Sequence, residues 1–123
     1  MAHILIVDDS PTEVHVFRSM LERHGYRVSD ACDGEEGVAK ARAECPDLVL
    51  MDIVMPGMDG FQATRMLNSD PDTSSLPVVI LSTKGEESDR IWGMRQGARG
   101  YLAKPVTEHT LVGEIRSILG GTR

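Results

Sequence analysis

The stretch that decides the fold is LVLMDIVMPGMDG, residues 48–60, in which four apolar residues lead directly into Asp52. An apolar run with no polar interruption is typical of a strand buried on both faces, as in a parallel sheet covered by helices. The Met-Pro-Gly turn at 55–57 then carries the chain away from the strand. The stretch holds no basic residue, so the partners of the Asp52 carboxylate must come from distant segments.

Short apolar runs alternate with helical patterns along the rest of the chain. Strands are expected at 3–9, 26–31, 46–52, 78–82 and 100–103. Helices are expected to follow them, at about 11–24, 35–43, 61–67, 86–96 and 108–119. This alternation predicts an α/β, flavodoxin-like (βα)5 fold, with a parallel five-stranded sheet in the order 2-1-3-4-5 and helices on both faces. Ligands of such a sheet bind outside the carboxyl ends of strands 1 and 3.

Two helix starts can be predicted in detail. Ser10 is expected to cap the first helix, with Pro11 in its first turn and Glu13 closing a capping box by reaching back to the backbone of Ser10. Asp59 and Gly60 are read as a turn and the cap of the third helix rather than as metal ligands.

Length and charge narrow the class of protein. The 123 residues predict a single domain over 1–123 with no output domain, ending in a frayed tail at 120–123. The net charge of −6 argues against nucleic acid or an anionic membrane as a partner. No signal peptide or membrane span is recognisable, and the two cysteines lie outside any C-x-x-C pattern. A cytoplasmic protein with reduced thiols is therefore expected.

The residues that follow the predicted strands carry chemistry. Asp8 and Asp9 follow the first strand, Asp52 the third, Ser82 ends the fourth, and Lys104 follows the fifth. All project to one edge of the sheet. Carboxylates that close repel one another, and a hard divalent cation with oxygen ligands, such as Mg²⁺, relieves this repulsion. A nucleophilic carboxylate, a metal and a fixed cation are the set that phosphoryl transfer to an aspartate requires.

The same residues resemble the response-regulator receiver domains of two-component signalling, the CheY-like family. The motifs are VDDS (7–10), MDIVMPGMDG (51–60), Ser82 after VVIL, and GYLAKP (100–105). They span the whole chain in the family's order and spacing. The resemblance implies a domain that takes a phosphoryl group from a histidine kinase and switches conformation to control partner binding.

Roles are implied position by position. Asp52 would be the phosphoacceptor, with Lys104 and Ser82 meeting the phosphoryl group. The Mg²⁺ ligands would be Asp9, Asp52 and the backbone carbonyl of Val54, with Asp8 binding through water.

Two further features are implied by the resemblance. Ser82 and Tyr101 would be the switch residues, Ser82 moving to the phosphoryl group and Tyr101 changing rotamer. The Lys104–Pro105 peptide bond would be cis.

Two positions depart from the flagellar chemotaxis regulators. Val54, two residues after the acceptor, has no polar side chain to orient an attacking water, and Lys84, two after Ser82, is basic where those regulators often carry an acid. The hypothesis is that these two residues slow self-dephosphorylation. The alternative is that both are tolerated variation at the rim of the site.

A closer resemblance concerns SPTE (10–13), GFQATR (60–65) and WGMRQGAR (92–99). These segments are similar to the single-domain regulators of the chemotaxis-like systems that control twitching by type IV pili. The implied phosphodonor is a CheA-like histidine kinase. The implied target is a protein that contacts the face of helix 4, strand 5 and helix 5, and Trp92 would either pack within helix 4 or belong to that face. The domain is expected to be a monomer and not an enzyme, apart from catalysing its own phosphotransfer and dephosphorylation.

Three alternatives remain at this point. The chain could be a generic CheY-like adaptor or phosphate sink in another chemosensory system. It could be an aspartyl-phosphate phosphatase, but that class needs an acid where Val54 stands. It could be a receiver-like domain that binds partners without phosphorylation, although Asp9, Asp52, Ser82 and Lys104 argue against this.

Overall fold

The computed structural model describes residues 1–120. Its strands are β1 (His3–Val7), β2 (Arg27–Ala31), β3 (Leu48–Met51), β4 (Val78–Ser82) and β5 (Gly100–Ala103). They form one parallel sheet in the order β2-β1-β3-β4-β5, which confirms the predicted topology. The helices are α1 (Pro11–Arg23), α2 (Gly34–Glu44), α3 (Gly60–Ser69), α4 (Glu87–Arg95) and α5 (Glu108–Ile118). Apart from Gly120, the predicted frayed end lies outside the described residues.

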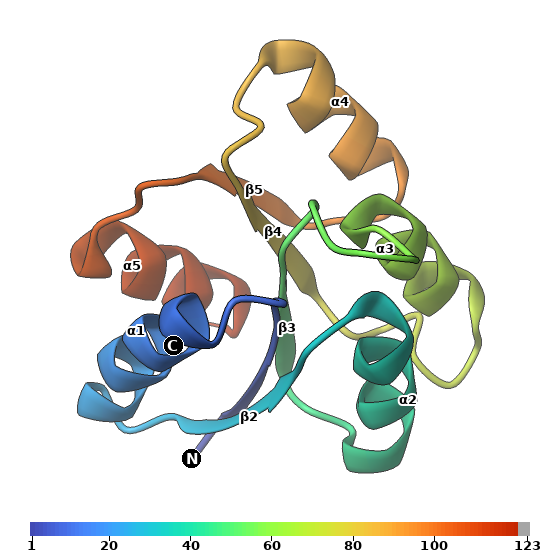
Figure 1. The fold of residues 1–123 in the computed structure, drawn as a ribbon. Helices are drawn as coiled ribbons and strands as arrows, with labels where there is room; N and C mark the ends of the chain where they lie inside the picture. The colour runs from blue at the N-terminus through green and yellow to red at the C-terminus, as the bar shows by residue number, and fades with distance from the viewer. Residues whose placement is uncertain (121–123) are drawn as a thin grey trace.

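The helices cover the sheet in two layers (Figure 1). On one face α1 and α5 pack against alternate strand residues, and Phe17, Leu21, Leu111 and Ile115 are buried there with Ile4, Ile6, Leu48, Leu50, Val79 and Leu81. On the other face α2 and α3 bury Val38, Ala41, Ala63 and Leu67 against Leu5, Val7, Val49 and Met51. Every residue of β1, β3 and β4 is buried. The apolar run at 48–51 is therefore a strand enclosed from both sides, as predicted.

A smaller core lies under α4, where Ile80 of β4 and Tyr101 of β5 pack with Ile53 and Ala98. Gly93 lets α4 approach the sheet, because a Cβ at this position would lie 2.8 Å from the Ile80 side chain and 3.0 Å from the Tyr101 ring. Most of α4 is otherwise exposed.

The two helix starts differ from the prediction in one respect. Asp59 caps α3 with a complete capping box, in which Asp59 Oδ1 accepts from the backbone N–H of Gln62 and Gln62 Oε1 accepts from the backbone N–H of Asp59. Ser10 caps α1 by accepting from the backbone N–H of Glu13, but the predicted return contact from the Glu13 side chain is wrong. The backbone N–H of Ser10 instead donates to Asp8 Oδ1 at 2.9 Å, so this donor is satisfied without the Glu13 carboxylate.

Within residues 1–120, no helix is both long and apolar enough to cross a bilayer.

Candidate functional site

Three carboxylates meet at the carboxyl edge of the sheet. Val7 and Met51 are paired in the register of β1 and β3, so the residues that follow them, Asp8 and Asp52, lie side by side. The backbone N–H of Asp52 donates to the Val7 carbonyl at 2.9 Å, which continues the ladder one step beyond the strands. Oxygen atoms of Asp8, Asp9 and Asp52 all lie within 4.8 Å of one another. Asp8 and Asp52 are buried and Asp9 is exposed, so the cluster opens to solvent on one side.

Lys104 enters this cluster from the segment after β5. Its Nζ lies 3.3 Å from Asp8 Oδ2 and 3.4 Å from Asp52 Oδ1. Only 10% of its side chain is exposed. The peptide bond between Lys104 and Pro105 is cis, the isomer that the family resemblance implies.

Glu13 is a member of the site that the sequence analysis missed. Its carboxylate accepts a hydrogen bond from Lys104 Nζ and forms an ion pair with it. The sequence signal was the spacing from Ser10, which is the same for a capping box and for a side chain directed at the strand ends. Spacing along a helix therefore could not separate the two.

Burial changes the pKa values of the site's carboxylates and lysine, and their partners compensate for it to different degrees. Burial raises the pKa of Asp52, and Lys104 offsets this only in part. Burial raises the pKa of Asp8 as well. For Lys104, burial alone would lower the pKa, but the hydrogen bond to Glu13 and the charges of Asp52 and Asp8 outweigh it and raise the pKa. The lysine is thus held as an ammonium, while the carboxylates still lack enough positive charge nearby.

The donor set suits a hard divalent cation. Asp8, Asp9 and Asp52 offer only oxygen ligands, and the exposed side at Asp9 leaves coordination positions for water. Mg²⁺ typically binds in this way, through one or two carboxylates while keeping several waters. The cation would also supply the positive charge that is missing from the surroundings of Asp8 and Asp52.

The sequence profile of the response regulator receiver domain matches residues 4–116, which includes every group described above. The chain belongs to this family.

Among relatives of this receiver domain is Protein PilH of Pseudomonas aeruginosa, which is 60% identical over 121 residues; the match covers 98% of this chain and 100% of that protein. A solved structure of the receiver domain of the sensor histidine kinase PA1611 from P. aeruginosa, with a magnesium ion in its active site cleft, has a TM-score of 0.90 at 32% identity, covering 97% of this chain and 98% of that one. The CheX–CheY–BeF3–Mg complex of Borrelia burgdorferi contains a chain with a TM-score of 0.90 at 28% identity, covering 95% and 88%.

The two predicted switch residues of the receiver domain share a partner. Ser82, the last residue of β4, is fully buried, and its Oγ accepts from the backbone N–H of Lys84 at 3.1 Å. Tyr101 of β5 is also buried, and its hydroxyl donates to the backbone carbonyl of Lys84. The main chain of Lys84 therefore links the Ser82 hydroxyl, at the carboxyl end of β4, to the Tyr101 ring under α4.

Other predicted positions lie on the surface of the receiver domain. Val54 is 57% exposed beside the acid cluster, and its apolar side chain offers no polar group there. That its carbonyl binds the metal stays a prediction. Trp92 is 49% exposed on α4, so about half of its side chain is not packed against the domain.

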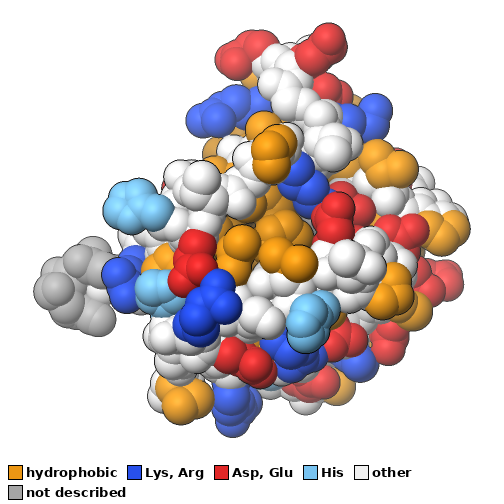
Figure 2. Space-filling model, turned by 60° about the vertical axis from the view of Figure 1, so that its left-hand side comes forward, with side chains coloured by type: hydrophobic (Ala, Val, Ile, Leu, Met, Phe, Trp, Pro, Cys, Tyr) orange, Lys and Arg blue, Asp and Glu red, His pale blue; other side chains and the backbone are white. Residues whose placement is uncertain are grey.

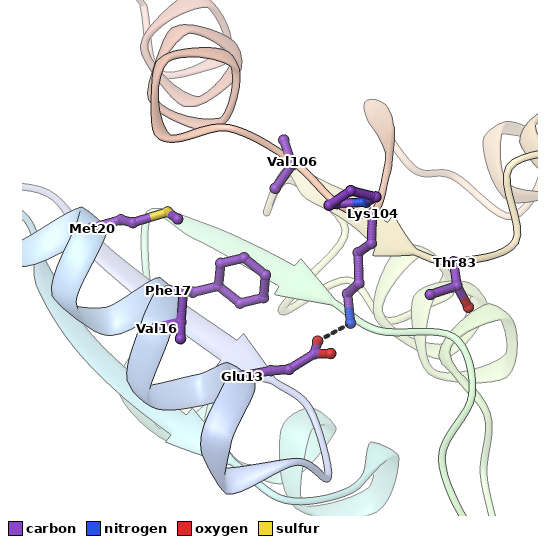
Figure 3. Close-up of a pocket in the computed structure, with 8 residues that line it drawn as sticks. Glu13, Val16, Phe17, Met20, Thr83, Lys104 and Val106 are labelled. Atoms are coloured by element: carbon purple, nitrogen blue, oxygen red, sulfur yellow. Dashed lines mark hydrogen bonds and ion pairs between the residues drawn. The ribbon is translucent and has the colours of Figure 1, made fainter.

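A pocket of about 390 Å³ lies beside Lys104, between α1 and the segment that follows β5. Figure 3 shows Phe17 and Met20 on its α1 side, Val106 opposite them, and the Glu13–Lys104 pair at one end. Lys104 Nζ is 5.9 Å from the centroid of the Phe17 ring. In Figure 2 hydrophobic side chains gather in a hollow with charged groups around it. The pocket is thus apolar along its length and charged at the end that touches the acid cluster.

Proposed function

We propose that this receiver domain is a phosphorylation-controlled switch, in which a histidine kinase transfers a phosphoryl group to Asp52 and the modified domain binds a protein target. The observation that carries the proposal is the position of Asp52, buried beside Asp8 and Asp9 with the Lys104 ammonium 3.4 Å from its Oδ1. An acceptor oxygen, a cation for the incoming oxygens and oxygen ligands for a metal are all present. This is the set that phosphoryl transfer to a carboxylate requires.

Magnesium is the cation that the donor set fits. Asp9, Asp52 and the Val54 carbonyl would bind it, with Asp8 acting through a water molecule. When bound, it supplies positive charge to the oxygens of the transferring phosphoryl group.

The residues of the chain then have separate tasks. A carboxylate oxygen of Asp52 attacks phosphorus, the new O–P bond forms as the P–N bond of the phosphohistidine breaks, and the imidazole leaves and takes up a proton. Lys104 pairs with one phosphoryl oxygen. Ser82 reaches another by giving up its contact with the Lys84 N–H. That loss alters the Lys84 main chain, which also holds the Tyr101 hydroxyl, and this is how the change at Asp52 reaches α4.

The wider assignment rests on similarity. The 60% identity to PilH across nearly the whole chain supports a stand-alone regulator of twitching by type IV pili, served by a CheA-like kinase. The target surface would be α4, β5 and α5, where Ile91, Trp92 and Met94 are exposed. We also propose that the domain acts in the cytoplasm as a monomer and is not an enzyme towards other substrates.

The proposal is tested by incubating the protein with Mg²⁺ and acetyl phosphate and measuring intact mass. A gain of one phosphoryl group per chain is expected, and a chelator should prevent it. A phosphatase would instead hydrolyse many equivalents of the donor without keeping the group. A wild-type protein that gains no mass and shows no spectral change with beryllofluoride would refute the proposal.

Replacing Val54 with asparagine is expected to accelerate loss of the phosphoryl group by about three- to tenfold, because an amide at this exposed position can orient an attacking water. This is less than the roughly hundredfold or more of a full general base. A time course of phosphate loss measures the effect. Val54→Leu is the matched control and should match the wild type; equal rates for the asparagine variant would contradict the hypothesis about Val54.

A further inference from the structure

Lys104 is shared among three carboxylates, and one of them does not come from a strand end. Asp8 and Asp52 follow β1 and β3, whereas Glu13 lies in the first turn of α1. Figure 3 shows the Glu13 and Lys104 side chains extending towards each other across the end of the apolar pocket. Glu13 therefore brings a helix into contact with the cation of the phosphorylation site.

The distances show which carboxylate holds the ammonium. Charge-assisted N–H···O bonds are typically about 2.7–2.9 Å long. The distances from Lys104 Nζ to Asp8 Oδ2 and Asp52 Oδ1, 3.3 and 3.4 Å, are both longer than this. The contact with Glu13 is the shortest of the three. The ammonium is thus nearest to Glu13, while it stays within hydrogen-bond reach of Asp8 and Asp52.

Burial does not force Glu13 into this contact. Its side chain is 42% exposed, against 5% for Asp8 and 11% for Asp52. A half-exposed carboxylate can be solvated by water when its partner leaves, so the pair can break at modest cost. The two buried carboxylates cannot compensate in this way.

We propose that Glu13 is a positioning residue that draws Lys104 to its own side of the three carboxylates in the unphosphorylated domain and competes with the phosphoryl group for it. This inference rests on the proposed function. Phosphorylation requires Lys104 to leave Glu13, which breaks the link between α1 and the segment after β5 at the charged end of the pocket. Glu13 thereby favours the unphosphorylated state and also limits how closely the lysine charge approaches Asp8 and Asp52 before phosphorylation.

Glu13→Gln should change the affinities for Mg²⁺ and for beryllofluoride in opposite directions. Without a phosphoryl group, Lys104 is released towards Asp8 and Asp52 and repels the cation, so Mg²⁺ affinity should fall about two- to fivefold. With saturating Mg²⁺, the released lysine is free for the phosphoryl mimic, so beryllofluoride affinity should rise about two- to fivefold. Titration calorimetry measures both.

Two comparisons separate a contact from a general effect of charge. Glu22→Gln removes the same charge further along α1, where Glu22 pairs with Arg18 and is exposed, and it should change neither affinity. In a Lys104→Met background, Glu13→Gln should change Mg²⁺ affinity by less than about twofold, because only the long-range charge is lost. Denaturant unfolding of each variant confirms that it is folded.

The inference is overturned by unchanged or weaker beryllofluoride binding in Glu13→Gln, by an equal loss of Mg²⁺ affinity with and without Lys104, or by a Glu22→Gln variant that behaves like Glu13→Gln. A wild type that binds Mg²⁺ but not beryllofluoride would count against the proposed function instead. In that case the Mg²⁺ measurements with and without Lys104 still decide whether Glu13 positions the lysine.

Discussion

Replacing Asp52 with asparagine is expected to abolish phosphorylation completely. The amide has nearly the shape of the carboxylate but no charge, so it is not a nucleophile for phosphorus and is a poor ligand for Mg²⁺. Intact mass after incubation with Mg²⁺ and acetyl phosphate should show no added phosphoryl group. A variant that still gains one would place the acceptor on another residue.

The same variant should be more stable than the wild type at neutral pH, which excludes misfolding as the cause. Burial raises the pKa of Asp52 in the folded state, so the folded protein holds the charged form at a cost. The cost is fully present above the raised pKa and disappears as pH falls below the ordinary value of 3.8. Asp52→Asn should therefore raise the free energy of unfolding by about 0.5–2 kcal/mol at pH 7 in the absence of metal, with a smaller gain in acid.

Asp70 offers a matched control of opposite sign. A backbone hydrogen bond from Asp72 and an ion pair with Arg42 lower its pKa in the folded state. Its contribution to stability is present above the ordinary pKa and is lost as pH falls through the lowered one. Asp70→Asn should thus be phosphorylated normally and be less stable than the wild type at pH 7. Denaturant unfolding of the Asp52 and Asp70 variants, at pH 7 and in acid, measures these differences in the free energy of unfolding.

Replacing Gly60 with alanine is expected to destabilise the fold by about 3 kcal/mol or more. A Cβ at the start of α3 would lie 2.0 Å from the backbone carbonyl oxygen of Asp52 and 2.8 Å from the Ile53 Cα. Both are main-chain atoms, so no side chain can move aside. The Gly60 N–H also donates to the Ile53 carbonyl at 2.9 Å, which fixes the helix start against the strand end.

Gly113→Ala is the matched control for Gly60→Ala, because a Cβ at Gly113 would have no neighbouring atom within 4 Å. It lies inside α5, where alanine is favoured over glycine, so Gly113→Ala should stabilise the protein by about 0.5–1 kcal/mol. Denaturant unfolding of the two variants measures the contrast. Equal stability for both would mean that the close approach at Gly60 is not rigid.

The strands and their order could be predicted because the information is local. Apolar runs such as LVLM indicate strands that are buried on both faces. Alternation of strands and helices with right-handed crossovers then leaves few possible strand orders. The meeting of Asp8, Asp9, Asp52 and Lys104 followed from topology alone, since parallel strands present their carboxyl ends at one edge. The structure places these residues together, within the distances given above.

Contacts between side chains of different elements could not be predicted in the same way. Glu13 has a partner 91 residues away, and its spacing from Ser10 indicated a local capping contact instead. Gly60 was read as part of a turn, although its closeness to the Asp52 carbonyl depends on how α3 packs on β3. Both depend on three-dimensional placement, which spacing along the chain does not encode.

Trp92 has a practical consequence for studying the switch. It is the single tryptophan of the chain, and it lies half exposed on α4, next to the glycine that brings α4 against Ile80 and Tyr101. The acid cluster is formed by other segments, at the ends of β1 and β3. Intrinsic fluorescence therefore acts as a built-in optical reporter of α4 and its surroundings, and a change in emission on adding a phosphoryl donor records the arrival of the signal there rather than the chemistry at Asp52.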